Sequence, residues 1–136
     1  MTIVVGVDGS PESGRALEWA AAEAERRGTD LSVLHAWYPT LGTDEADAEQ
    51  LLREHVAQAR SLAPKVPTTG RLVMSAAAAD ALIDASDGAE LVVVGSRAHF
   101  ALASLLLGSV ASACVRRCHC PVVVVPCAVQ NLRVAS

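Results

Sequence analysis

Acidic, hydroxyl and glycine residues follow two apolar runs of the sequence, in the segments Val7-Asp8-Gly9-Ser10 and Val94-Gly95-Ser96-Arg97. Gly108-Ser109 stand a little further along, at the start of a stretch with a helical pattern. Glycine lets a ligand approach the backbone closely, and the N–H groups and positive dipole at the start of a helix bind anions. These segments therefore predict a phosphate-bearing ligand, for which a triphosphate is the natural candidate.

The elements that position these segments alternate between short apolar strands and amphipathic helices, which is typical of a parallel sheet. The expected strands are residues 3–7, 31–36, 71–74, 91–94 and the valine run between Pro121 and Pro126; the expected helices are residues 11–27, a stretch through 52–62, 78–86 and 109–117. Five strands and four helices predict an open, doubly wound α/β fold. If the first and fourth strands are central neighbours, their carboxyl ends form the ligand site.

Local end signals support these boundaries. Ser10 can cap the first helix, Pro11 suits its first turn, and Gly28 is placed to stop it. Pro64 ends the second helix, and Gly88 follows the third where a C-terminal cap would lie. The prolines around the last valine run indicate an edge strand, where lost backbone donors matter least.

Composition limits the class of protein. A chain of 136 residues that is 51% hydrophobic, without a linker or repeat, predicts one domain over residues 1–136. A net charge of -4 and the lack of a basic stripe argue against nucleic acid as a partner. The N-terminus resembles a first strand and no signal peptide, and no apolar run reaches membrane-spanning length. We therefore expect a cytoplasmic protein without a membrane partner.

The cysteines near the C-terminus could form a metal site, because cysteine and histidine are the ligands that zinc prefers. Cys114 and Cys118 would share a helix face, but Cys118-His119-Cys120 lacks the usual gap between paired cysteines. All four cysteines, Cys127 included, lie in the last quarter of the chain, which argues against a disulfide framework. We expect no metal site, and cysteines that behave as small hydrophobic residues.

Several polar side chains have simpler interpretations than catalysis. His35 follows buried strand residues and is expected to lie in the core or at a strand end, and His55 is expected to pack along a helix face. Arg97 and His99 could reach phosphate oxygens or could be solvent-facing loop residues.

No catalytic set emerges from the serines. Neither Ser96 nor Ser109 has a histidine and carboxylate that the sequence places beside it. We therefore expect a protein that is not an enzyme, although slow ATP hydrolysis needs no covalent nucleophile.

A longer motif joins the second and third segments: Gly95, two residues, Ala98, nine residues, then Gly108-Ser109. Other matching stretches are VVGVDGSPES, VLHAW, LLLGSV and CPVVVVP, in this order along the chain. In this pattern the chain resembles the universal stress protein family, whose nucleotide-binding branch has glycine at the place of Ala98. The resemblance covers the whole chain and implies a Rossmann-like fold of the adenine nucleotide alpha hydrolase type.

The resemblance also implies a ligand and its contacts. The ligand would be ATP, with a divalent ion such as Mg²⁺ or Mn²⁺ on its phosphates. The adenine end would be held by Asp8 and the backbone of Ala36, the ribose would approach the backbone of Val94 and Gly95, and the phosphates would be held by Gly108, Ser109 and Val110. Ala98 belongs to the same binding loop.

Ala98 leaves two functions open. If the family's glycine serves a positive φ angle, alanine costs about 1–2 kcal/mol, and the expected function is an ATP-dependent switch in stress adaptation. If the glycine lets phosphate touch the backbone, the Ala98 methyl group and the bulk of Phe100 fill the loop. The alternative is then a homodimer that binds no nucleotide and acts through protein contacts. Both functions share a homodimer formed through the strand from Pro121 to Pro126, because an unpaired valine edge invites pairing.

Overall fold

The computed structural model describes residues 1–39, 44–96 and 108–126. Its strands are β1 (Thr2–Gly6), β2 (Asp30–Trp37), β3 (Thr68–Met74), β4 (Leu91–Gly95) and β5 (Val122–Val125). Its helices are α1 (Pro11–Arg27), α2 (Glu45–Leu62), α3 (Ala78–Ser86) and α4 (Ser109–Arg117). This part of the chain thus confirms the alternation of strands and helices that the sequence predicts.

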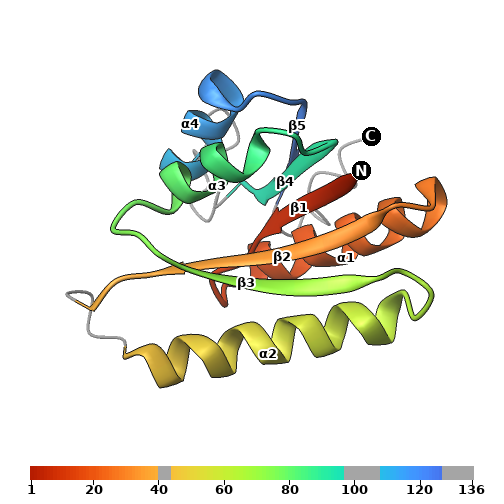
Figure 1. The fold of residues 1–136 in the computed structure, drawn as a ribbon. Coiled ribbons are helices and arrows are strands. Elements are labelled where there is room, and N and C mark those ends of the chain that lie inside the picture. Colours follow the sequence, from red (N-terminus) through yellow and green to blue (C-terminus); the bar gives the residue numbers. More distant parts are fainter. Residues whose placement is uncertain (40–43, 97–107, 127–136) are drawn as a thin grey trace, which may run out of the picture.

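The strands form one parallel sheet in the order β3-β2-β1-β4-β5 (Figure 1). Val4 of β1 pairs with Ser32 on one side and with Val92 on the other. The first and fourth strands are therefore central neighbours, as expected. Because the chain leaves β1 toward β2 and later returns to the other side with β4, the switch point of the sheet lies between β1 and β4.

Helices cover both faces of the sheet (Figure 1). Side chains alternate across a strand, so Ile3 and Val5 pack with α1 and α2, while Val4 packs with α3 and α4. Burial on both faces explains why the central strands are continuous apolar runs. These two cores hold β1 and β4 in place and leave their carboxyl ends at one rim.

The ends of α1 follow the predicted local signals. The Ser10 side chain accepts a hydrogen bond from the Ser13 N–H at 3.2 Å, and Pro11 stands in the first turn. At the other end, Gly28 adopts a left-handed conformation (φ 67°), which favours glycine. Both caps are local, so they set where α1 begins and ends without help from distant residues.

Other boundaries differ from the predictions. β1 begins and ends one residue earlier than expected, and α2 begins at Glu45, where the Asp44 carboxylate accepts a hydrogen bond from the Asp47 N–H at 2.8 Å. β3 begins at Thr68 and not at residue 71. Its central residues are mostly exposed because it is an edge strand, so the apolar pattern that marks the inner strands is missing there.

β5 forms the opposite edge of the sheet and pairs with β4. The valines of β5 are half-buried, since each face of the strand meets a core while its outer edge has no strand beside it in the described chain. Among the helices of the described ranges, none is long and apolar enough to cross a membrane.

Candidate functional site

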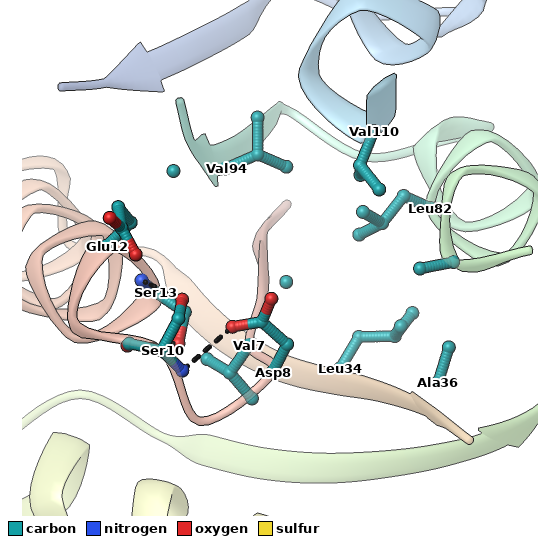
Figure 2. Close-up of a pocket in the computed structure, with 13 residues that line it drawn as sticks. Val7, Asp8, Ser10, Glu12, Ser13, Leu34, Ala36, Leu82, Val94 and Val110 are labelled. Atoms are coloured by element: carbon teal, nitrogen blue, oxygen red, sulfur yellow. Dashed lines mark hydrogen bonds between the residues drawn. The ribbon is translucent and has the colours of Figure 1, made fainter. Parts of the chain in front are cut away.

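A cavity of about 130 Å³ lies at the carboxyl ends of β1 and β4, between the start of α1 and α3 (Figure 2). Apolar side chains line most of it: Val7, Leu34, Ala36, Ala78, Leu82, Val94 and Val110. Polar side chains of one short segment line the rest: Asp8, Ser10, Glu12 and Ser13. The backbones of Gly6 and Gly95 complete the lining. The cavity therefore combines apolar walls with one polar side.

The polar side is held in shape by hydrogen bonds around the start of α1. The Ser10 N–H donates to Asp8 Oδ1 at 2.9 Å (Figure 2), and the Ser13 hydroxyl donates to the Ser10 carbonyl at 3.0 Å. Gly9 between them has φ 85°, a left-handed conformation that lets the chain turn from β1 into the helix. The turn fixes the Asp8 carboxylate beside the cavity.

Both backbone groups of Val7, the residue before Asp8, form hydrogen bonds with β2. The Val7 N–H donates to the Leu34 carbonyl at 2.9 Å, and the Val7 carbonyl lies 2.8 Å from His35 Nδ1. A carbonyl can only accept, so Nδ1 carries the hydrogen. His35 is 8% exposed, which confirms its place in the core. Its hydrogen bond ties β2 to the strand end that carries Asp8.

Glu12 is almost fully buried, with 4% of its surface exposed, as is Ser13 beside it. It packs directly on the end of β4. A Cβ added to Gly95 would lie 2.9 Å from both the Cβ and the carbonyl oxygen of Glu12. Glycine at position 95 is therefore required by the contact between α1 and β4, in addition to any role toward a ligand.

Most of the predicted site residues that the structure describes meet at this cavity. Its lining includes Asp8, Ala36, Val94, Gly95 and Val110. They come from the ends of β1, β2 and β4 and from the first turn of α4, which are far apart in the sequence.

The phosphate-binding end of the motif lies beside the cavity. Gly108 caps α4, and its N–H donates to the Ser96 carbonyl at 2.9 Å, while Ser109 is exposed. Neither residue belongs to the lining. Ala98 and Phe100 lie outside the described residues, as do Arg97 and His99.

Sequence reasoning missed Glu12, Ser13 and Leu82 as lining residues. A signal for Glu12 was present, because Glu12, Ala16 and Ala20 recur at helical spacing on the face of α1 that is buried. A carboxylate on a buried stripe is uncommon and indicates a specific role.

The charges of the lining are of one sign. Asp8 and Glu12 are its acidic members, and no basic side chain joins them among the lining residues that the structure describes. An ionised carboxylate only accepts hydrogen bonds, so this side of the cavity suits a ligand's hydroxyl or amine groups. No group of three or more histidine, cysteine or acidic side chains is arranged to hold a metal ion within the described ranges.

The cysteines lie away from the cavity. Cys114, on α4, is fully buried in the core, and burial, together with the neighbouring Cys118 thiol, raises its pKa to about 12. Burial likewise raises the pKa of Cys120. These thiols stay protonated at neutral pH, as expected for small core residues. Cys127 lies outside the described residues.

The second histidine singled out in the sequence is also structural. His55 is half-buried on α2, and its Nδ1 lies 2.9 Å from the Leu51 carbonyl. This contact within the helix agrees with the expected packing along a helix face.

A parallel sheet with helices on both faces and a cavity at its switch point defines a protein of the doubly wound α/β class. The model of the universal stress protein family matches residues 1–126. The chain belongs to this family.

Known relatives agree with this assignment. Universal stress protein Rv2005c of Mycobacterium tuberculosis is 38% identical over 131 residues, which cover 90% of this chain and 44% of that protein. The chain thus spans less than half the length of the curated relatives it matches.

Two solved structures match over almost their full length. A universal stress protein in complex with cAMP is 31% identical, with a TM-score of 0.78, and the match covers 94% of this chain and 98% of the other. The universal stress protein of Archaeoglobus fulgidus in complex with dAMP is 28% identical, with a TM-score of 0.71, and the match covers 92% and 97%.

Proposed function

We propose that this chain binds an adenine nucleotide in the cavity at the carboxyl ends of β1 and β4. The observation that carries the proposal is that Asp8, Ala36, Val94, Gly95 and Val110, selected from the sequence, line one cavity. The relatives solved with cAMP and dAMP, at 31% and 28% identity, support an adenine ligand.

The cavity suits the base in its chemistry. Apolar side chains form most of its walls, as the flat faces of a base require, and the rest of a nucleotide would lie at its mouth. Adenine has apolar faces for Leu34 and Leu82, and its exocyclic amine donates hydrogen bonds that the Asp8 carboxylate can accept.

The phosphates would lie at the start of α4. The first N–H groups of a helix have no acceptor within it, and its dipole is positive at that end. Val110 lines the cavity and Gly108-Ser109 precede it, so a nucleotide whose base is in the cavity can reach this helix end. The carboxylates on the other side of the cavity would repel phosphate and thereby favour one orientation.

We further propose that the nucleotide is ATP and that binding acts as a switch in stress adaptation without turnover. The residues present fit such a ligand, with acceptors for the amine and helix N–H groups for the phosphates. Mg²⁺ or Mn²⁺ would be held through the phosphates, since the described part of the chain offers no group of three or more metal-ligating side chains of its own. A single domain over residues 1–136 and a cytoplasmic location remain predictions.

A homodimer through β5 completes the proposal. The strand between Pro121 and Pro126 is a valine edge that a second copy could pair with. We expect Val124→Glu to give monomers in light scattering, whereas an unchanged dimer would place the interface elsewhere. The variant should keep the far-ultraviolet circular dichroism spectrum of the wild type.

Calorimetric titration of nucleotide-stripped protein with ATP and Mg²⁺ tests the proposed function, with Ala98→Gly as the matched variant. Micromolar binding by the wild type supports the proposal and shows that the motif tolerates alanine. Binding by Ala98→Gly alone would contradict it and favour the homodimer that acts through protein contacts.

A further inference from the structure

His35 of β2 is a buried polar side chain behind the wall of the cavity. It is 8% exposed and is not among the described residues that line the cavity, whereas its neighbours Leu34 and Ala36 are. Because side chains alternate along a strand, His35 points to the other face of the sheet, as Val33 does. Val33 packs there in the core that α1 and α2 cover. His35 therefore affects a ligand in the cavity through the backbone, and not by touching it.

The hydrogen bond of His35 holds β1 at the point where its pairing with β2 ends. The register of the two strands ends at the pair Gly6 and Leu34, and one further backbone hydrogen bond runs from the Val7 N–H to the Leu34 carbonyl. The Val7 carbonyl lies beyond this bond and accepts from His35 Nδ1 at 2.8 Å. The imidazole thus extends the connection between the two strands by one hydrogen bond, directly before Asp8.

This connection fixes the relative position of two residues of the cavity wall. Val7 is followed by Asp8 and His35 is followed by Ala36, and both Asp8 and Ala36 line the cavity (Figure 2). Val7 is 5% exposed, so without the imidazole its carbonyl would lose a partner where water hardly reaches. A buried carbonyl without a partner is costly, and the strand end would have to shift to find another. Such a shift would move Asp8 relative to Ala36.

The choice between purine bases depends on this relative position. Under the proposed function, the exocyclic amine of adenine donates to the Asp8 carboxylate while the base lies against the wall that Leu34 and Ala36 form. Hypoxanthine has a carbonyl in place of the amine, so it offers the carboxylate no donor there and is disfavoured. Groups that recognise a ligand in this way must be held within about 0.5 Å of the productive geometry.

We propose that His35 is a positioning residue that, through its hydrogen bond to the Val7 carbonyl, makes the site select adenine over hypoxanthine nucleotides. The inference rests on the proposed function and deepens it. A packing role would require only an apolar side chain of similar size at position 35. The positioning role requires a hydrogen-bond donor at the place of Nδ1.

The test compares ATP with inosine triphosphate by calorimetry on nucleotide-stripped wild type, His35→Leu, His35→Asn and His55→Leu. Leucine removes the donor and keeps the bulk, whereas the amide of asparagine can donate from near the place of Nδ1. His55 is the matched control, because its Nδ1 also lies close to a backbone carbonyl, that of Leu51 at 2.9 Å. That contact stays within α2 and outside the described lining of the cavity.

The expected readout is the ratio of the two affinities. We expect wild type, His35→Asn and His55→Leu to bind ATP roughly 10- to 100-fold more tightly than inosine triphosphate, the value of one hydrogen bond to a charged group. His35→Leu should reduce this ratio at least roughly fivefold. Asparagine is smaller and more polar than leucine, so a packing role predicts the reverse order for the two variants.

Three results would overturn the role of His35 and leave nucleotide binding standing. They are equal binding of both nucleotides by the wild type, a preference for ATP that survives in His35→Leu, and a preference that is lost in His35→Asn as well. If the wild type binds neither nucleotide, the proposed function fails and the inference fails with it.

A measurement on the wild type decides if His35→Leu does not fold. In ¹⁵N-labelled protein, the Nδ1 signal of His35 should shift on addition of ATP, while that of His55 should stay in place. A His35 signal that does not move at saturating ATP would overturn the positioning role.

Discussion

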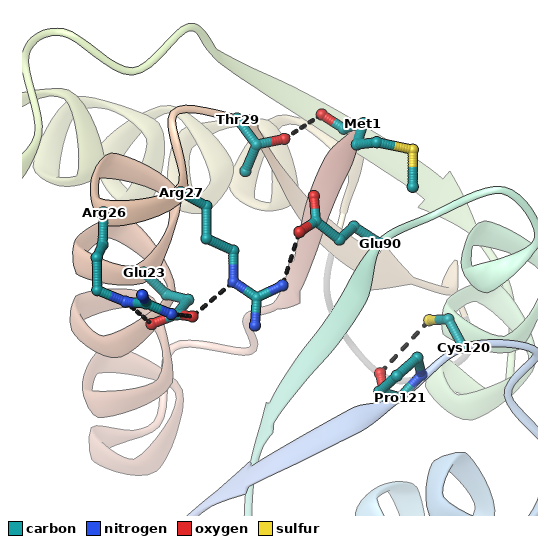
Figure 3. Close-up of polar contacts among 8 residues, drawn as sticks. All are labelled: Met1, Glu23, Arg26, Arg27, Thr29, Glu90, Cys120 and Pro121. Carbon is teal, nitrogen blue, oxygen red and sulfur yellow. Dashed lines mark hydrogen bonds and ion pairs between the residues drawn. The ribbon is translucent and has the colours of Figure 1, made fainter.

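At the amino ends of the strands, opposite charges pair with one another, whereas at the carboxyl ends two carboxylates line a cavity. Arg27 at the end of α1 places Nε 2.6 Å from one oxygen of Glu23 and Nη1 2.7 Å from one oxygen of Glu90 (Figure 3). The Thr29 hydroxyl donates to the Met1 carbonyl at the same end. These contacts join α1, β1, β2 and the start of β4.

The carboxyl ends show the opposite arrangement. Asp8 and Glu12 gather on one side of the cavity, and no basic side chain is among its described lining residues. The ion pairs at the amino ends stabilise the fold, while the carboxylates at the carboxyl ends line the cavity where we propose that a ligand binds. The difference agrees with the proposed function, in which the amino ends mainly serve stability and the carboxyl ends bind the ligand, as in other open α/β sheets.

The largest effect is expected from Gly95→Ala at the carboxyl ends. The new Cβ would lie 2.9 Å from the carbonyl oxygen of Glu12, so α1 must shift away from β4. We expect a loss of about 1–3 kcal/mol in the free energy of unfolding, measured with urea, and ATP binding weakened at least roughly tenfold. Unchanged stability and affinity would show that this contact does not hold the cavity in shape.

Asp8→Ala should separate binding from stability at the same end. ATP affinity should fall roughly 10- to 100-fold, because a charged acceptor is lost. The free energy of unfolding should fall by about 1 kcal/mol at most, since the Ser10 N–H loses its Asp8 acceptor at an exposed position. Asp30→Ala, an exposed acid at the amino end of β2, is the control and should leave affinity unchanged. Equal effects of both variants on affinity would contradict the contrast between the two ends.

Gly28→Ala should lower stability without affecting binding. The residue has φ 67°, and an added Cβ would meet no atom within 4 Å, so the cost is conformational and about 1 kcal/mol. Gly14→Ala, inside α1 and equally open, should instead raise stability by up to about 1 kcal/mol. Calorimetry with ATP should give the wild-type affinity for both variants. A weaker affinity for Gly28→Ala would contradict the contrast between the two ends of the sheet.

The smallest effect is expected from Glu23→Gln, and it should depend on pH. Hydrogen bonds from Arg26 and then Arg27 lower the pKa of Glu23 from 4.5 to about 2. A pKa that is lower in the folded state adds stability above pH 4.5, and this contribution disappears as pH falls toward 2. The wild type should therefore have the higher urea midpoint at pH 7, and the difference should shrink below pH 4.5. A difference that does not change with pH would contradict the ion pairing.

The parts of the fold that depend on local signals could be predicted from the sequence. Ser10, Pro11 and Gly28 mark both ends of α1 because caps act within a few residues. The sequence predicts β3 too short, since the exposed residues of β3 around Gly70 lack the apolar pattern of an inner strand.

Site residues at the ends of neighbouring strands can be predicted from the sequence, but a site residue whose burial depends on packing between distant segments cannot. Asp8 and Gly95 could be placed together because β1 and β4 were expected to be neighbours. Glu12 resembles an ordinary acid in the first turn of a helix, where the dipole favours it. Its burial depends on the missing side chain of Gly95, a contact between distant parts of the chain that no local pattern contains.

Mapping of backbone amide signals during a titration with ATP tests the central claim most directly. In ¹⁵N-labelled, nucleotide-stripped protein, the account predicts that signals of Asp8, Ala36, Gly95 and Val110 shift in a saturable way, while those around Glu90 at the amino ends do not. No shifts at millimolar ATP, or shifts confined to the amino ends of the strands, would contradict it.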